Sequence, residues 1–419
     1  MRQVSRVCGI AVITACGVAL SCASMESPPG GPPDAEPPKL VRVTPDTGAV
    51  NVRPKVAVFR FDEVVSERSR AAAKLEELFL ISPATGAPDV DWDREAIEVK
   101  PRNGWRPNTT YTVTLMPGLA DLRGNVRTEG ASLIFSTGPQ IATSAVRGIV
   151  FDWVAGRVVP GAYVEAISHP DSVVYVGTSD SSGTFIVRNI PPGDYTVRAL
   201  VDANKNRELD LRELWDSARV TLGDSARVEM LTHAHDTMPP RIDQVTPRDT
   251  FTLRVTTTRP LDPSLVIDPS LFTLLASDSS VVPIAEARAA AVYERLQAER
   301  DRARADSIAR AAPPLATGER APRPGDPPQT ITAVTPSKPS PVTEIIIVVP
   351  RALRPGATYK LRALNLRGIM GTARSSEREF KMPETPKPPV TPPVTPPGAP
   401  PAGRGNPPPP AGAPPPGGP

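Results

Sequence analysis

The sequence predicts an all-β protein made of three tandem antiparallel β-sandwich domains. Residues 37–45 (PPKLVRVTP) return in related form as residues 239–247 (PPRIDQVTP), and residues 106–114 (RPNTTYTVT) return as residues 354–362 (RPGATYKLR). In addition, short runs that alternate apolar and polar residues are separated by Pro, Gly and Asn turns, a pattern typical of sandwiches. We therefore expect one β-rich module at each end of the folded region and a different module between the two copies.

The N-terminus has the features of a bacterial export signal. Arg2 and Arg6 supply a positive segment, and residues 7–20 supply an apolar stretch that is too short to span a bilayer as a permanent helix. The rest of the chain has no cysteine with which to form a disulfide. The three cysteines of the sequence are Cys8, Cys16 and Cys22.

Residues 19–22 (ALSC) resemble a bacterial lipobox, in which a small residue precedes a cysteine that is acylated before cleavage. Residues 13–16 (ITAC) fit the motif better but leave too short an apolar run, so we predict a lipoprotein signal peptide over residues 1–21 and lipidation of Cys22. An ordinary secretory signal with an incidental cysteine is the alternative. The Pro- and Gly-rich residues 22–37 would then form a stiff tether between the membrane and the body.

The first domain is predicted over residues 38–138. Alternating strands are expected at residues 56–61, 97–100 and 111–115, with one short helix over residues 66–77 that Ser66 would cap. The opening Pro-Pro segment and residues 59–65 (FRFDEVV) make this segment resemble the SbsA-type bacterial Ig-like domain.

The middle domain, predicted over residues 141–234, has four motifs in the order seen in carboxypeptidase-regulatory-like, prealbumin-type domains, which it resembles. Gly183 can take the positive φ of a hairpin, and Pro191-Pro192-Gly193 makes a turn ahead of Tyr195. The resemblance implies a small antiparallel sandwich. The four motifs are residues 146–150 (VRGIV), 161–165 (GAYVE), 178–185 (TSDSSGTF) and 189–197 (NIPPGDYTV).

The third domain, predicted over residues 238–382, repeats the first with an insertion over residues 284–341. The Ala, Arg and Glu content of residues 284–312 predicts a mostly exposed helix, and the Pro-rich remainder of the insertion predicts a disordered loop. A buried strand is expected at residues 343–349. Residues 383–419 are about half proline and predict a disordered tail.

Three tyrosines follow a Pro-containing turn at the start of a predicted strand. This placement resembles the tyrosine corner of Greek-key sandwiches, in which the hydroxyl bonds a nearby main-chain group. A structural role is expected for all three, which are Tyr111, Tyr195 and Tyr359.

Residues 202–213 (DANKNRELDLRE) are the best candidate for a site. Counted from Asp202, oxygen side chains fall at positions one, three, five, nine and twelve, with Glu208 at the main-chain carbonyl position and Leu209 as an apolar anchor, as in a calcium-binding EF-hand loop. The loop follows a strand, so an EF-hand proper is excluded, and Arg207 stands where Gly is usual. The expected Ca²⁺ ligands are Asp202, Asn204, Asn206, Glu208, Asp210 and Glu213. The alternative is an acidic connection rich in turn formers.

Two other clusters contain side chains suited to chemistry. His233, His235 and Asp236 stand in a predicted linker, and with only His169 elsewhere they lack the three ligands that zinc needs, so a solvated linker is expected. An acidic cluster beside Trp92 has the carboxylates that a glycoside hydrolase uses, but alternation on a loop or edge strand explains it as well. This cluster comprises Asp89, Asp91, Asp93 and Glu95.

The sequence thus favours a lipid-anchored protein of the outer membrane or cell surface that acts as a non-enzymatic structural, spacer or binding module, as resemblance to surface-protein modules implies. Its partners would be the membrane, through the anchor, and an envelope protein or glycan. Nucleic acid is not expected, because 48 basic and 45 acidic residues balance to a formal charge of +3. The alternatives are a calcium-dependent receptor for a glycan or protein, and a surface hydrolase that uses Asp91 and Asp93.

Overall fold

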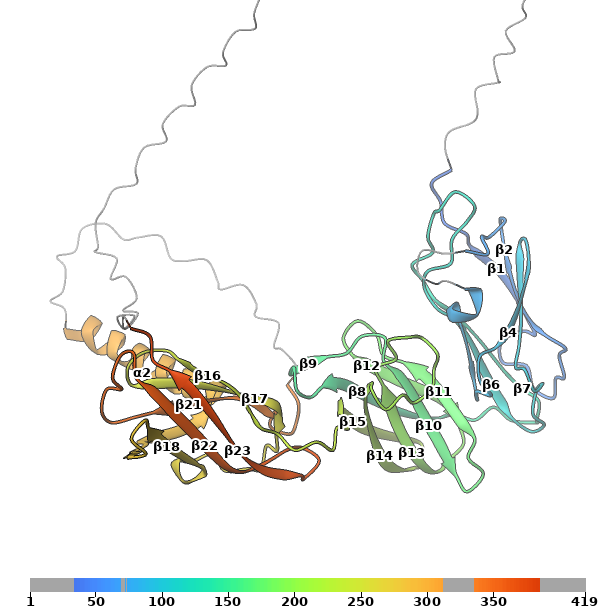
Figure 1. Ribbon diagram of the computed structural model, residues 1–419. Helices are drawn as coiled ribbons and strands as arrows, with labels where there is room; N and C mark the ends of the chain where they lie inside the picture. The colour runs from blue at the N-terminus through green and yellow to red at the C-terminus, as the bar shows by residue number, and fades with distance from the viewer. Residues whose placement is uncertain (1–33, 69–71, 73, 312–334, 385–419) are drawn as a thin grey trace, which may run out of the picture. The chain divides into compact units, whose positions relative to one another are not determined.

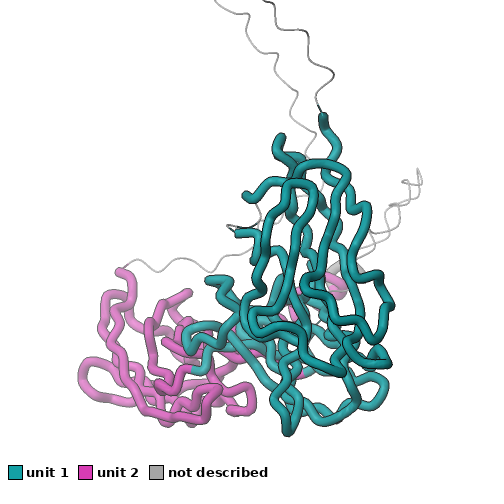
Figure 2. Tube along the Cα trace, turned by 90° about the vertical axis from the view of Figure 1, so that its right-hand side faces the viewer, with its two compact units in different colours: residues 1–235, 333–337 teal, residues 236–332, 338–419 magenta. Residues whose placement is uncertain are grey.

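The computed structural model describes residues 34–68, 72, 74–311 and 335–384 (Figure 1). The chain divides into two compact units, Met1–His235 with Ala333–Ser337 and Asp236–Thr332 with Lys338–Pro419 (Figure 2). The first unit contains two β-sandwiches and the second unit contains one, which confirms the predicted fold class. The signal peptide with Cys22, most of the tether and nearly all of the tail lie outside the described residues.

The first sandwich pairs a four-stranded sheet with a three-stranded sheet. Its strands alternate as predicted: in β2 the side chains of Ala57, Phe59 and Phe61 are buried, and those between them face outward. Phe59 and Phe79 meet edge to face, with ring centroids 5.3 Å apart. The sheets have the orders β1-β2-β5-β4 and β3-β6-β7, with β1 at Leu40–Thr44, β2 at Ala57–Phe61, β3 at Phe79–Ser82, β4 at Asp89–Asp93, β5 at Ala96–Lys100, β6 at Thr110–Leu115 and β7 at Ala131–Ser136.

The helix predicted over residues 66–77 is wrong for the part of that segment that the structure describes. A single 3-10 turn, η1, spans Leu75–Leu78, and Lys74 precedes it without a side-chain cap. Ser66 instead bonds the main chain of Arg68, two residues on. Leu75 and Leu78 are buried in the sandwich core, so tertiary packing and not helix propensity decides this segment.

The second sandwich consists of two layers that meet where β14 and β15 pair at two positions only, Leu214 with Ala234 and Trp215 with His233. One layer contains β11, β10, β13 and β14, and the other contains β15, β8 and β12, with β9 beside β8. Its strands are β8 at Ser144–Asp152, β9 at Arg157–Val158, β10 at Tyr163–His169, β11 at Val174–Thr178, β12 at Thr184–Ile190, β13 at Gly193–Leu200, β14 at Leu214–Leu222 and β15 at Ser225–Ala234.

Not every pairing in this sandwich is antiparallel. Strand β15 lies parallel to β8, from Ser225 beside Ala145 to Thr232 beside Asp152. The predicted antiparallel sandwich is borne out at the other strand pairs, and this pair departs from it. Parallel neighbours need a long crossover connection, and here the strands β9 to β14 lie between the two in the chain.

The third sandwich repeats the sheet order of the first. The order β16-β17-β21-β20 matches β1-β2-β5-β4, and β18-β22-β23 matches β3-β6-β7, with the short β19 added at the edge. Its elements are β16 at Ile242–Pro247, β17 at Thr252–Leu261, the 3-10 turn η2 at Pro269–Leu271, β18 at Phe272–Ala276, β19 at Val281–Val282, β20 at Glu286–Ala289, α2 at Ala290–Ala311, β21 at Val342–Val348, β22 at Thr358–Arg367 and β23 at Ala373–Lys381.

The insertion in the second copy begins later than predicted. Residues 286–289 form β20 and pair with β21, so the extra segment replaces the hairpin turn at residues 94–95 with residues 290–341. The helix accordingly begins at Ala290 and not at residue 284. The Ala- and Arg-rich sequence favours a helix here, but Ala287 is buried against Ile347 across the strand pair, and this packing overrides propensity.

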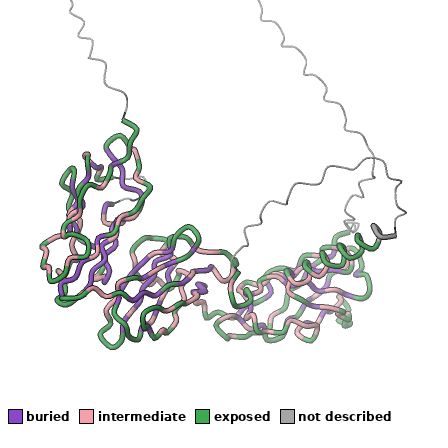
Figure 3. Tube along the Cα trace, turned by 180° about the vertical axis from the view of Figure 1, so that it is seen from behind, coloured by how far each residue is buried: buried purple, intermediate pink, exposed green. Residues whose placement is uncertain are grey.

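The helix α2 is mostly exposed, as predicted, whereas the strands of each sandwich hold the buried residues (Figure 3). Glu294 fixes its first turns to the sheet through Arg254, 2.9 Å away, and Arg248, 3.5 Å away. None of the helices in the described ranges combines the length and the apolar character that crossing a bilayer requires.

The three predicted tyrosine corners are confirmed. The hydroxyl of Tyr195 donates to the main-chain oxygen of Pro191 at 2.6 Å. The hydroxyls of Tyr111 and Tyr359 accept from the main-chain nitrogens of Arg106 (2.6 Å) and Arg354 (2.9 Å). Each bond fixes a turn to the strand that follows it, once in each sandwich.

Candidate functional site

The predicted calcium loop, residues 202–213, joins β13 to β14 in the first unit. It curls because the carboxylate of Asp202 accepts hydrogen bonds from two main-chain nitrogens of the loop, those of Asn206 (3.1 Å) and Arg207 (2.9 Å). Positive φ angles at Lys205 and Arg207, 58° and 59°, turn the chain back on itself. The local geometry is therefore that of a compact loop closed by its own acidic side chain.

The remaining oxygen-bearing side chains of the loop accept hydrogen bonds from main-chain nitrogens or bond to one another. Asn204 and Asn206 accept from main-chain nitrogens two residues on, both at 2.9 Å, and the side-chain nitrogen of Asn204 donates to Asp210 at 2.7 Å. One oxygen of Glu213 accepts from the main-chain nitrogen of Ala203 at 2.9 Å. Its second oxygen, Oε2, is buried and has no hydrogen-bond partner among the described residues.

Arg207, at the position where a calcium loop has Gly, leaves the loop and reaches the first sandwich. Its guanidinium donates to the main-chain oxygens of Phe79 (2.8 Å), Glu77 (2.9 Å) and Glu76 (3.3 Å), which lie at the end of η1. Burial lowers the pKa of the Arg207 guanidinium from its ordinary value, and nearby Tyr163, Asp202 and Glu77 act in the opposite direction. The loop is therefore a joint between two sandwiches.

Strand pairing and apolar packing complete this joint. The hydroxyl oxygen of Ser82, at the end of β3, accepts from the main-chain nitrogen of Val176 in β11 at 3.0 Å, and Ala84 bridges Val174 just beyond. Leu209, the predicted apolar anchor, packs on a small core shared by both sandwiches. That core consists of Leu80, Tyr163, Val176 and Leu200.

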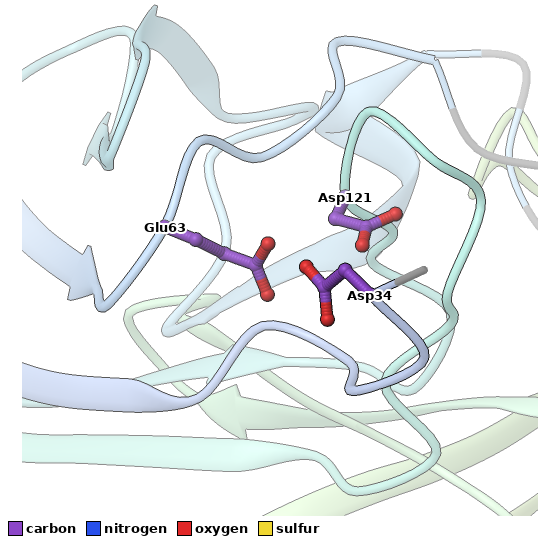
Figure 4. A group of neighbouring side chains, drawn as sticks. All are labelled: Asp34, Glu63 and Asp121. Carbon is purple, nitrogen blue, oxygen red and sulfur yellow. The ribbon is translucent and has the colours of Figure 1, made fainter. Parts of the chain in front are cut away.

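Three carboxylates of the first sandwich lie close together at a place that no sequence motif indicates (Figure 4). Asp34, Glu63 and Asp121 place one oxygen each within 4.8 Å of one another. Burial raises the pKa of Glu63, and the charges of Asp121 and Asp34 add to the effect. Burial also acts on Asp121, but hydrogen bonds from Asn125 and Arg123 outweigh it and keep the pKa of Asp121 below its usual value. The three residues lie far apart in the chain, so only the fold brings them together.

The two histidines of the expected linker belong to the fold instead. His233 lies in β15 and is 9% exposed, so the expectation of a solvated linker is wrong at this residue. Its ring stacks on His235 with centroids 4.3 Å apart, and His235 stacks on Trp215 at 3.6 Å. Each histidine places Nδ1 near a main-chain oxygen, of Leu231 and His233 respectively. Neither histidine belongs to a group of three metal-ligating side chains in the part of the chain that the structure describes.

The acidic cluster considered for hydrolysis lies on β4, an edge strand of the first sheet. Asp89 pairs with Lys100 at 3.1 Å, while Asp91 and Asp93 are exposed. Trp92 donates from its indole nitrogen to the main-chain oxygen of Val65 at 2.9 Å. Charged side chains on an edge strand discourage its pairing with the strands of other chains. This effect explains the acidic residues of β4 without a catalytic role.

Comparison with protein families matches the first two domains. Residues 34–137 match a bacterial Ig-like domain, and residues 145–230 match a carboxypeptidase regulatory-like domain. Both resemblances predicted for these segments are confirmed. No curated protein matches the sequence.

Among solved structures, the chain is similar to the N-terminal part of the bacterial S-layer protein SbsC (14% identity, TM-score 0.20, 35% of this chain and 24% of that one). It spans only about a quarter of that structure. It is also similar to an L,D-transpeptidase from Mycobacterium smegmatis (16%, 0.18, 60% and 75%) and to the major pilin subunit BcpA of Bacillus cereus (9%, 0.18, 44% and 67%). At these scores the likenesses carry no argument about activity.

Proposed function

We propose that the protein is a lipid-anchored spacer of the cell envelope, without catalytic activity, that holds its binding surfaces away from the membrane. The observation that carries the proposal is the joint at Arg207. Contacts between domains of one chain allow relative motion unless they are extensive. Here a main-chain hydrogen bond from Ala84 to Val174, a shared apolar core and a half-buried guanidinium connect the first two sandwiches. A spacer needs such a resistant joint, and an Ig-like module beside a carboxypeptidase regulatory-like module supplies sandwiches suited to it.

The anchor is proposed at Cys22, which follows the apolar residues 7–20. Metabolic labelling with an alkyne fatty acid tests it. We expect the wild-type protein and the Cys16→Ser variant to be labelled and to fractionate with membranes, and Cys22→Ser to lose both properties. Labelling that persists in Cys22→Ser would reject this anchor. Crosslinking in native membranes, followed by purification through the intact lipoprotein, then identifies the envelope component that the spacer holds.

A calcium-dependent receptor is the second candidate, favoured by one observation. Glu213, at position twelve of the loop, has a buried oxygen without a hydrogen-bond partner in the described part of the chain, and such an atom costs about 1–3 kcal/mol if nothing satisfies it. Asp202, Asn204, Asn206 and Asp210 supply further oxygens from the same loop, and Ca²⁺ takes six to eight oxygen ligands. The donor set fits the ion, although Arg207 and Lys205 place positive charge in the same loop.

Thermal unfolding with and without Ca²⁺ tests the second candidate. We expect chelation to lower the melting temperature of the wild-type protein, and Asp202→Asn with Glu213→Gln to abolish the difference. The matched control is Asp194→Asn with Asp224→Asn, which removes two carboxylates elsewhere in the same sandwich. An unchanged melting temperature on chelation would eliminate calcium binding and leave the spacer proposal untouched.

A further inference from the structure

Three exposed arginines lie on adjacent strands of the second sandwich, on the outer face of the β15-β8-β12 layer. The parallel register places Arg227 of β15 directly beside Arg147 of β8. On the other side of β8, Ile186 pairs with Arg147, and Arg188 lies two residues farther along β12. Neighbouring strands are about 4.8 Å apart, so the three positive charges crowd one small surface.

Salt bridges do not engage these three arginines in the described part of the chain. The ion pairs of this sandwich use other arginines, Arg157 with Asp152 and Arg198 with Glu165, and none within the described ranges involves Arg147, Arg188 or Arg227.

Two carboxylates near this face accept hydrogen bonds from neutral groups and make no ion pair with the three arginines. Glu229, two residues along β15 from Arg227, accepts hydrogen bonds from the hydroxyl and the main-chain nitrogen of Ser337. Asp180 accepts from the main-chain nitrogens of Ser182 (2.8 Å) and Thr184 (3.0 Å) in its own turn. The parallel register brings the positive charges of Arg147 and Arg227 side by side without a direct ion pair, and because like charges repel, this arrangement favours an external anion at this face.

Two hollows of the first unit meet at this face and share Thr184 and Ile186. The first hollow has a volume of about 310 Å³, lies between the two sandwiches and is lined mainly by hydroxyl-bearing residues and by Arg188. The second hollow is lined by Arg147 and Arg227. The hydroxyl-bearing residues of the first hollow are Thr112, Thr114, Ser132, Thr178 and Thr184.

The two hollows together offer the chemistry of an acidic sugar chain. Hydroxyl groups donate and accept hydrogen bonds, as sugar hydroxyls do. Guanidinium groups bind carboxylates through two parallel hydrogen bonds. The lining contains no aromatic side chain, whereas proteins that bind single-stranded nucleic acid stack bases on aromatic rings.

We propose that this surface binds an acidic polysaccharide, with a carboxylate-bearing sugar against Arg147 and Arg227 and neighbouring sugar hydroxyls against Thr114 and Thr184. The site lies apart from the loop at residues 202–213 and goes beyond the spacer function, because it names a class of ligand that the spacer would hold. It requires neither the lipid anchor nor calcium.

Fluorescence anisotropy with the full-length protein and a labelled oligogalacturonate tests the proposal. We expect binding that weakens as salt rises, because screening shortens the range of charge interactions to about 8 Å at physiological ionic strength. We also expect no binding of a neutral maltooligosaccharide of equal length. Arg147→Gln with Arg227→Gln should weaken binding at least about tenfold, equivalent to about 1.4 kcal/mol. The control Arg374→Gln with Arg378→Gln removes two exposed arginines from β23 and should bind as the wild type does.

Two further measurements separate a glycan site from a general anion surface. Thr114→Val with Thr184→Val keeps every charge and should weaken oligogalacturonate binding without changing its salt dependence. Polyphosphate of equal charge should bind less tightly than oligogalacturonate. The proposal is overturned if oligogalacturonate does not bind, if the double Gln variant binds equally, or if polyphosphate binds as tightly and the valine variant has no effect. If the double Gln variant has a lowered melting temperature, Arg147→Lys with Arg227→Lys serves instead. It keeps the charge but cannot form the two parallel hydrogen bonds of a guanidinium, so it should still bind oligogalacturonate less tightly.

Discussion

The guanidinium of Arg207 lies 2.8 Å from the main-chain oxygen of Phe79 and connects the second sandwich to the first. The same side chain reaches the oxygens of Glu77 and Glu76, so one guanidinium bonds three carbonyl groups. A loop that looks from sequence like a metal site therefore serves in the structure as a joint. Arg207, the residue that departs most from the calcium-loop pattern, is the residue that forms the joint.

Replacing Arg207 by Gln removes the charged donor of these hydrogen bonds, while the oxygen of Glu76 keeps the main-chain nitrogen of Phe79 as a partner. Hydrogen bonds of charged groups contribute about 1.5–3 kcal/mol, so we expect the free energy of unfolding of the first unit to fall by about this amount. Denaturant unfolding measures it. Lys205→Gln is the control, because Lys205 lies 3.5 Å from Glu77 with its side chain 59% exposed, and it should cost less than about 1 kcal/mol. Equal losses in the two variants would refute the role of Arg207.

Gly148 in β8 admits no side chain. A Cβ atom built there would lie 2.0 Å from the main-chain oxygen of Val228 and 2.7 Å from the ring of Phe185. Gly148→Ala should therefore destabilise the first unit by about 1–3 kcal/mol or more, since overpacking displaces backbone as well as side chains. Gly223→Ala, where nothing lies within 4 Å of the new atom, is the matched control and should melt close to the wild type. Comparable melting of the two variants would show that β8 and β15 are not packed this closely.

Acidification should weaken the first unit through His235. Burial and then the neighbouring His233 lower the pKa of His235, against smaller opposing effects of its main-chain hydrogen bond and Asp216. A base with a lowered folded-state pKa binds its proton more readily when unfolded, so its contribution to stability is lost as pH falls below the unfolded value of about 6.5. Unfolding at pH 7 and pH 5 should show a loss that His235→Gln reduces. His169→Gln, at an exposed residue, should leave the loss intact. An identical pH dependence in His235→Gln would contradict this assignment.

Features set by local sequence were predictable, and features set by strand register were not. A Pro-containing turn followed by Tyr determines the corner at Tyr195 within a few residues, so the sequence pattern predicts its hydrogen bond. The helix boundary at Ala290 depends instead on the pairing of β20 with β21. The neighbours Arg147 and Arg227 likewise meet only because β15 lies parallel to β8. Sequence spacing alone contains none of these long-range pairings.

The candidate loop shows the same division. A local pattern can indicate that residues 202–206 curl, because the hydrogen bonds of Asp202 and Asn204 stay within the loop. The partners of Arg207 lie in another domain, and no local pattern could identify them. The sequence contains one hint of the joint: Arg207 occupies the sharpest point of the turn, where a calcium loop has Gly.

The proposed spacer depends most directly on whether the first two sandwiches move as one body. Spin labels at Arg102→Cys and Arg219→Cys, both exposed and one in each sandwich, report this distance when Cys8, Cys16 and Cys22 are replaced by Ser. Double electron–electron resonance should give one narrow distance distribution that broadens when Arg207 is also replaced by Gln. A broad or bimodal distribution with Arg207 intact would contradict the joint and, with it, the proposed spacer.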